Sequence, residues 1–126
     1  MKTSCFKDYP GDMGVAICLY PPIDWTGLRF PSLAPDTQIF YAIKNKSISR
    51  EQYIQQYNEH ILGELDPAFI YKLFERNVLL CWEPPGEFCH RRLVAAWIQD
   101  KLGIEVPEWS HKDEILKKDS NSVSLF

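Results

Sequence analysis

Residues 78–102 read VLLCWEPPGEFCHRRLVAAWIQDKL, and this stretch decides the fold. Its first five residues are a continuous apolar run, which is typical of a strand buried on both faces of a parallel sheet. The Glu-Pro-Pro-Gly that follows stops the strand, because proline lacks the N–H that a sheet ladder uses. A helix is predicted from Phe88 or Cys89 to Leu102, with Gly103 as its C-terminal cap. A strand, a tight loop and a helix in this order are typical of α/β folds.

Signals earlier in the chain predict more strands and helices. Ser49 followed by Gln52 is a capping box, and Asp66 before Pro67 combines an N-cap with the residue favoured at the first helical position. By residue number, the expected strands are 3–6, 15–20 and 104–106, and the expected helices are 36–45, 49–63 and 66–77. We therefore predict an α/β fold, a small three-layer domain with a mainly parallel sheet.

The predicted sheet also indicates where a ligand would bind. In parallel sheets, ligands bind beyond the carboxyl ends of the strands. Here those ends are followed by the loop after Trp82 and by a long irregular stretch, residues 21–35, after Tyr20. Loops of that length often cover functional sites. Tyr20, Trp25 and Trp82 are therefore candidate pocket-lining residues, although tryptophans are more often core residues than ligand platforms.

Length, composition and charge narrow the class of protein. The chain has 126 residues, 45% of them hydrophobic and 25% charged. That balance fits one globular domain, expected at residues 1–109, followed by a polar and partly disordered tail at 110–126. The net charge of −3 predicts no general attraction to phosphate backbones, so any nucleic-acid contact would be local. Without an apolar run of about 20 residues or a signal-peptide pattern, we expect a cytoplasmic protein with no membrane contact.

Four cysteines, at positions 5, 18, 81 and 89, raise the question of disulfides and metals. Because no export signal is recognised, reduced thiols are expected. A zinc site formed by Cys81, Cys89, His90 and Cys5 is an alternative, but its spacing matches no common closed zinc pattern. The chain also lacks the Gly-x-Gly-x-x-Gly and Gly-x4-Gly-Lys-[Ser/Thr] motifs. We therefore predict neither a metal nor a cofactor.

The start of the predicted helix 88–102 concentrates the reactive side chains. Backbone N–H groups there have no intrahelical partner and, with the helix dipole, favour anions and thiolates. Cys89 lies at this end, and His90 and Arg91 add positive charge beside it, so a lowered thiol pKa and a nucleophilic thiolate are expected. Cys81, near the end of the strand, is the candidate second thiol, and Glu83 is placed to orient His90 or Arg91.

Each of these residues also has a purely structural interpretation. Two cysteines at a strand-loop-helix junction can be buried core thiols. His90 can satisfy the helix start, and Glu83 can cap it. Arg91 and Arg92 can be solvated surface charges. The residue pattern leaves these alternatives open.

The chain resembles a bacterial and phage family, domain of unknown function number 488, over residues 3–109. The most specific similarity is the signature Leu-Leu-Cys-aromatic-Glu followed by Cys-His-Arg-x-Leu, which stands here at 79–83 and 89–93. The resemblance implies a small Rossmann-like α/β fold and a site around the Cys-His-Arg sequence. It implies no established reaction.

One departure from that family concerns the charge of the ligand. Many members end the second strand with an arginine, whereas this chain has Leu19 or Tyr20 at that position. If the arginine holds an anionic substrate in relatives, Arg29 is the candidate replacement here.

These observations predict a small enzyme with a Cys-His-Arg site that acts on an anionic small molecule, either nucleotide-like or phosphorylated. Cys89 is expected to be the nucleophile or redox-active thiol, His90 a general base and Glu83 an orienting carboxylate. The candidate anion-binding residues are Arg91, Arg92 and Arg29. The alternative is a non-catalytic module that binds a small anion, a nucleic acid or a protein through the same pocket, with Cys89 in a structural role.

Overall fold

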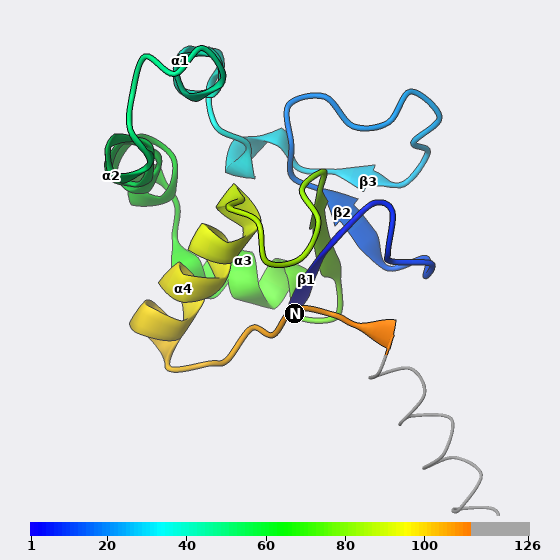
Figure 1. Cartoon of the computed structure of the whole chain (residues 1–126). Helices are drawn as coiled ribbons and strands as arrows, with labels where there is room; N and C mark the ends of the chain where they lie inside the picture. Colours follow the sequence, from blue (N-terminus) through cyan, green and yellow to red (C-terminus); the bar gives the residue numbers. More distant parts are fainter. Residues whose placement is uncertain (112–126) are drawn as a thin grey trace, which may run out of the picture.

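The fold is built on a four-stranded sheet in which all neighbouring strands are parallel. A computed structural model describes residues 1–111 of the chain (Figure 1). The strand order is β1-β4-β2-β3. The strands are β1 (Lys2–Cys5), β2 (Gly14–Ala16), β3 (Leu28–Arg29) and β4 (Val78–Cys81). Because β4 lies between β1 and β2, all of its residues are buried, which explains its uninterrupted apolar sequence.

Within residues 1–111, four α-helices accompany the sheet: α1 (Thr37–Lys44), α2 (Arg50–His60), α3 (Pro67–Phe74) and α4 (His90–Leu102), with short 3-10 helices η1 (Pro31–Leu33) and η2 (Leu62–Glu64). Local signals set their ends. The Asp36 carboxylate accepts a hydrogen bond from the Ile39 N–H at 2.8 Å, and the Ser49–Gln52 capping box forms both of its bonds. Gly103 ends α4 at a φ of 68°, in the left-handed region that favours glycine.

The two faces of the sheet are covered differently. All four α-helices contribute buried side chains to one cluster with Val15, Ile17 and Leu79, so they pack on the same face (Figure 1). On the other face, aromatic side chains from loops and from the segment after α4 cover two residues of β4, and the members of this cluster are Phe6, Tyr9, Trp25, Val78, Leu80 and Trp109. Within residues 1–111, this second covering layer therefore contains no α-helix.

The predicted fold class is confirmed, with corrections to single elements. The domain is α/β and Rossmann-like, with a parallel sheet. The prediction of a strand at 104–106 is wrong. Glu108 instead forms an isolated bridge with Thr3. Pro107 has no N–H with which to extend a ladder of hydrogen bonds. The short edge strand β3 lies inside the stretch that was expected to be irregular.

The domain limits stay a prediction. Most of the polar tail expected at 110–126 lies outside the described residues. None of the helices within residues 1–111 has the length and apolar character needed to span a bilayer.

Tyr57 ties α2 to the core, and its hydroxyl offers a stability test. The hydroxyl donates to the Leu33 carbonyl at 2.6 Å in a fully buried position. Tyr57→Phe leaves that carbonyl without its donor, so we expect a loss of about 1–2 kcal/mol in the free energy of unfolding. Tyr53→Phe, one turn earlier on α2, is the matched control, because the Tyr53 hydroxyl has no hydrogen bond within residues 1–111. Equal losses in urea titrations of the two variants would contradict this account.

Candidate functional site

A cleft of about 640 Å³ opens beyond the carboxyl ends of β2 and β4. Its lining comes from the segments that follow these strands, from α1 and α2, and from the start of α4. The cleft thus lies where the topology predicts a ligand site. Six of the predicted site residues line it, namely Tyr20, Cys81, Trp82, Glu83, Cys89 and His90.

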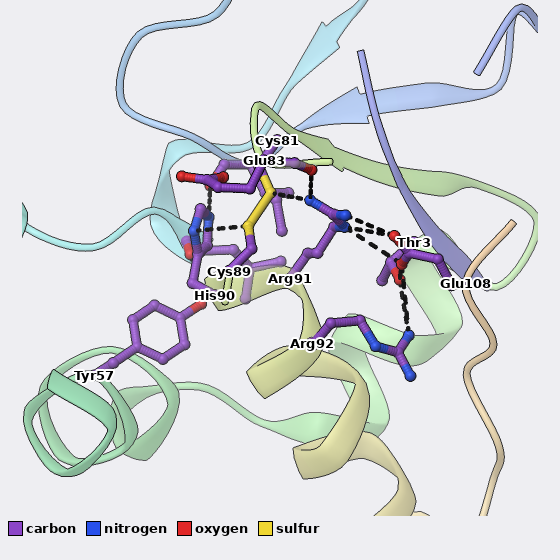
Figure 2. Close-up of a disulfide and its surroundings, with 11 residues drawn as sticks. Thr3, Tyr57, Cys81, Glu83, Cys89, His90, Arg91, Arg92 and Glu108 are labelled. Atoms are coloured by element: carbon purple, nitrogen blue, oxygen red, sulfur yellow. Dashed lines mark hydrogen bonds and ion pairs between the residues drawn. A yellow bond between two sulfur atoms is a disulfide. The ribbon is translucent and has the colours of Figure 1, made fainter. Parts of the chain in front are cut away.

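Cys81 and Cys89 are joined by a disulfide in the lining of the cleft (Figure 2). Cys81 is the last residue of β4 and Cys89 is the N-cap of α4, so the turn between them brings the sulfurs together. Gly86 supplies that turn with a φ of 88°. The expectation of reduced thiols is therefore wrong for this pair, because local loop geometry sets their proximity. Cys5 and Cys18 are free thiols.

His90 is buried and fixed in one orientation. Its Nε2 lies 2.7 Å from the Ile17 carbonyl, which can only accept, so Nε2 carries the proton. Nδ1 then has a free lone pair, and it faces the Cys89 sulfur at 3.8 Å. Burial lowers the pKa of His90 to about 4, an effect that the Ile17 carbonyl opposes and the Arg91 charge reinforces. His90 is therefore neutral at pH 7.

Aromatic rings of α2 hold His90 in place. The Tyr57 ring packs against the imidazole with centroids 5.7 Å apart (Figure 2). Tyr53 stacks on Tyr57 at 6.1 Å and meets the edge of Phe88 at 5.2 Å. The His90 imidazole and Phe88 thus both pack against α2, which limits the movement of the site.

Arg91 points away from the cleft into a buried network (Figure 2). Its side chain is 1% exposed and forms an ion pair with Glu108, with Nη2 to Oε1 at 2.6 Å and Nε to Oε1 at 3.0 Å. Nη1 donates to the Cys81 sulfur at 3.0 Å and to the Glu83 carbonyl at 2.7 Å. The prediction that Arg91 clamps an anion in the pocket is therefore corrected, because its N–H groups are directed at protein atoms.

The other two predicted anion-binding residues also lie outside the cleft lining. Arg92 is on the exposed side of α4 and donates to the Thr3 hydroxyl at 2.8 Å and the Val106 carbonyl at 2.9 Å. Arg29, on the edge strand β3, donates to the Trp25 carbonyl at 3.3 Å. The predicted cluster of three anion-binding arginines is therefore not assembled.

The predicted roles of Trp25 and Glu83 change as well. Trp25 packs against Phe6 with ring centroids 5.2 Å apart, on the far face of the sheet, so it is not a pocket residue. Glu83 contacts Arg91 through its main-chain carbonyl, which leaves its carboxylate facing the cleft. The Ile17 carbonyl, and not the Glu83 carboxylate, orients His90.

Among the residues of the site that were not predicted from the sequence, three have charged or thiol side chains. Lys44 lines the cleft with its ammonium 5.4 Å from the Phe40 ring centre, and helical spacing from Phe40 was the available signal. Cys18 also lines the cleft, and burial raises its pKa to about 11. Glu108 had no signal, because it lies in an irregular segment and reaches Arg91 only through the folded chain.

The reduced form of the site contains a possible set of metal ligands. Among residues 1–111, the ligand atoms of Cys81, Cys89 and His90 lie within 4.8 Å of one another. Two thiolates and an imidazole suit a soft divalent metal such as zinc. Cys5, the fourth ligand considered from sequence, is not part of the set.

Comparison with protein families identifies the type of domain. Residues 12–102 match the family DUF488-N3a, described as "Active DUF488-N3 subclade". The chain belongs to the DUF488-N3a family. The match confirms the resemblance to domain of unknown function 488, and it includes every residue that lines the cleft. No significant match was found among curated proteins or among solved structures.

The buried His90 predicts how the stability of this DUF488-N3a domain depends on pH. Its pKa is about 4 in the folded chain, against 6.5 for the ordinary side chain. The unfolded chain therefore binds the proton first, so stability that is present above about pH 6.5 is lost as the pH falls to about 4, by about 3 kcal/mol in total. Urea titrations across this window, with the disulfide intact, should show this loss in the wild type and not in His90→Gln.

His60→Gln is the matched control for that experiment. His60 is exposed at the end of α2, so its replacement removes one imidazole without disturbing the core or the cleft. Parallel curves for the wild type and His90→Gln would contradict the assignment of a neutral, buried imidazole.

Proposed function

We propose that this protein is a thiol-dependent enzyme in which Cys89 is the nucleophile and His90 is its general base. The observation that carries the proposal is the orientation of His90, with Nε2 bound to the Ile17 carbonyl and Nδ1 facing the Cys89 sulfur. Once the disulfide is reduced, Nδ1 takes the thiol proton as the sulfur attacks an electrophilic atom of the substrate. The same proton then goes to the leaving group, so the imidazole ends neutral.

The position of Cys89 at the start of α4 supports the same role. As the N-cap it lies at the positive end of the helix dipole, and its side chain accepts no capping hydrogen bond from the backbone. The dipole favours the thiolate, and no backbone N–H is bound to the sulfur that would have to be released before it reacts. The family description, which contains the word "active", also favours an enzyme.

The cleft favours a planar, anionic small molecule as the substrate. Its walls include the aromatic side chains of Tyr20, Phe40 and Trp82, which suit a flat ring. Lys44 supplies a positive charge there, in place of the three arginines predicted from sequence. A nucleotide-like or phosphorylated compound fits this combination, and the Glu83 carboxylate is placed to contact its polar groups.

The competing function is a non-catalytic binding module that uses the same cleft. The observation in its favour is the burial of Cys89, which is 3% exposed in the disulfide form. In that case Cys89→Ala would retain both ligand binding and cellular activity. A variant that retains ligand binding but stops turnover supports the enzyme.

Alkylation of individual cysteines tests the proposed nucleophile without a known substrate. In Cys81→Ser protein, where the disulfide cannot form, Cys89 should react with iodoacetamide with a midpoint below about pH 8.5, the value of a free thiol. Cys18 is an internal control in the same cleft, because its pKa is raised to about 11. We expect Cys89 to react at least about tenfold faster than Cys18 at pH 7, as measured by peptide mass spectrometry.

Substitution of the base completes that test. In Cys81→Ser/His90→Gln protein the rate of Cys89 alkylation at pH 7 should fall, since the proton acceptor is gone. If Cys89 reacts only after unfolding, or no faster than Cys18, the nucleophile assignment is wrong.

Two reagents that differ in charge test the preference for anions. Iodoacetate carries a carboxylate and iodoacetamide does not, so the ratio of their rates at Cys89 reports the local potential. Lys44→Gln should lower this ratio by about threefold at low ionic strength, and Glu83→Gln should raise it. Loss of the effect in 1 M NaCl is expected, because salt screens partly exposed charges. If Lys44→Gln leaves the ratio unchanged, Lys44 does not contribute to anion binding at the site.

A further inference from the structure

We propose that the Cys81–Cys89 disulfide is a redox-active pair with a fixed direction of exchange. A small monothiol such as glutathione attacks the Cys89 sulfur, and Cys81 leaves as a thiolate beside Arg91. The inference deepens the proposed function and rests on it, because the exchange sets whether the Cys89 nucleophile is free. Arg91 is a positioning residue in this scheme and does not touch the substrate.

The two sulfurs have unlike neighbours, and this difference sets the direction. Figure 2 shows the disulfide between Arg91 on the Cys81 side and His90 on the Cys89 side. The Arg91 guanidinium donates to the Cys81 sulfur at 3.0 Å, whereas the Cys89 sulfur faces a neutral imidazole nitrogen at 3.8 Å. A cation stabilises a thiolate, and the more stable thiolate is the better leaving group in thiol–disulfide exchange. The α4 dipole also favours a thiolate at Cys89, but a guanidinium in direct hydrogen-bond contact with Cys81 is the stronger of the two effects. Cleavage therefore releases Cys81 and leaves the mixed disulfide on Cys89.

The network around Arg91 keeps the cation at this sulfur. Glu108 binds the Nε and Nη2 edge of the guanidinium and also accepts a hydrogen bond from the Thr3 hydroxyl of β1. The Glu83 carbonyl holds Nη1 from the loop. Because Arg91 is 1% exposed and held on several sides, its charge stays beside Cys81 when the disulfide opens.

The exchange proceeds in two steps, and atoms and electrons balance in each. In the first, the attacking thiolate forms a sulfur–sulfur bond with Cys89 while the bond to Cys81 breaks, and Cys81 takes up the electron pair. In the second, another thiolate attacks the sulfur of the bound monothiol and releases Cys89. Two monothiols are oxidised to their disulfide, and the protein pair is reduced by two electrons. The reverse sequence, with an oxidised monothiol, closes the pair and removes the nucleophile.

The experiment compares adducts on the two cysteines within one sample. Oxidised protein is exposed briefly to reduced glutathione, quenched with acid, alkylated, and mapped by peptide mass spectrometry. We expect early adducts on Cys89 to exceed those on Cys81 by at least about tenfold, because the leaving thiolates differ in stability. Unfolded molecules would give a ratio near one, so loss of folding is recognised directly.

Variants of the two neighbouring arginines test the cause. Arg91→Met combined with Glu108→Gln removes the charge without leaving an unpaired partner, and should lower the adduct ratio and slow reduction by roughly tenfold. Arg91→Lys, which keeps the charge, should restore part of both. Arg92→Lys is the matched control, because Arg92 also lies near Glu108 but contacts neither sulfur, and it should change neither quantity.

Three results would overturn the proposal. They are an adduct ratio of one or below in the folded wild type, an equal effect of Arg92→Lys, and zinc bound to the pair in purified protein in place of the disulfide. The proposed function fails separately, because alkylation of Cys89 in Cys81→Ser protein involves no exchange. Rapid alkylation with no directional exchange would leave the enzyme proposal standing and remove this one.

Discussion

The hydrogen bond from His90 to the Ile17 carbonyl is the interaction on which the arrangement of the site depends. It joins the first residue of α4 to the segment just after β2, two elements far apart in the sequence. The bond selects the protonated nitrogen, so the free lone pair of His90 faces Cys89. With Tyr57 against the ring, the start of α4 has little freedom to turn, and Cys89 and Arg91 on either side of His90 are placed with it.

Burial explains why His90 and Arg91, the two basic residues of the Cys-His-Arg sequence, have different charge states. An imidazole can lose its charge, and burial makes His90 neutral. A guanidinium cannot, so a buried Arg91 needs a carboxylate partner, which Glu108 supplies. The cost of desolvating this pair is offset by its geometry and by the bonds to Cys81 and the Glu83 carbonyl. The result is a cleft with a neutral base in its wall and a fixed cation behind it.

Much of the fold follows from local signals that act within a few residues. The apolar run of β4, the capping box at Ser49 and the glycine after α4 all have their effect through neighbouring backbone groups, so they were predictable. The position of the cleft followed from the parallel sheet. The roles of the arginines did not, because consecutive helical residues point in directions about 100° apart, and the boundary of α4 had to be known to assign them. The partnership of Arg91 with Glu108 depends on where an irregular segment returns to β1, for which the sequence carries no short-range signal.

The central claim is that His90 is a neutral base whose free nitrogen faces Cys89, and nitrogen NMR of the imidazole tests it most directly. In ¹⁵N-labelled protein at pH 7, the account predicts the shift pattern of a neutral ring protonated at Nε2, with Nδ1 unprotonated. The pattern should persist until the pH approaches about 4, where His90 titrates. A protonated Nδ1 at pH 7, either in the other neutral tautomer or in an imidazolium, would contradict the account, because Cys89 would then face a donor and have no base.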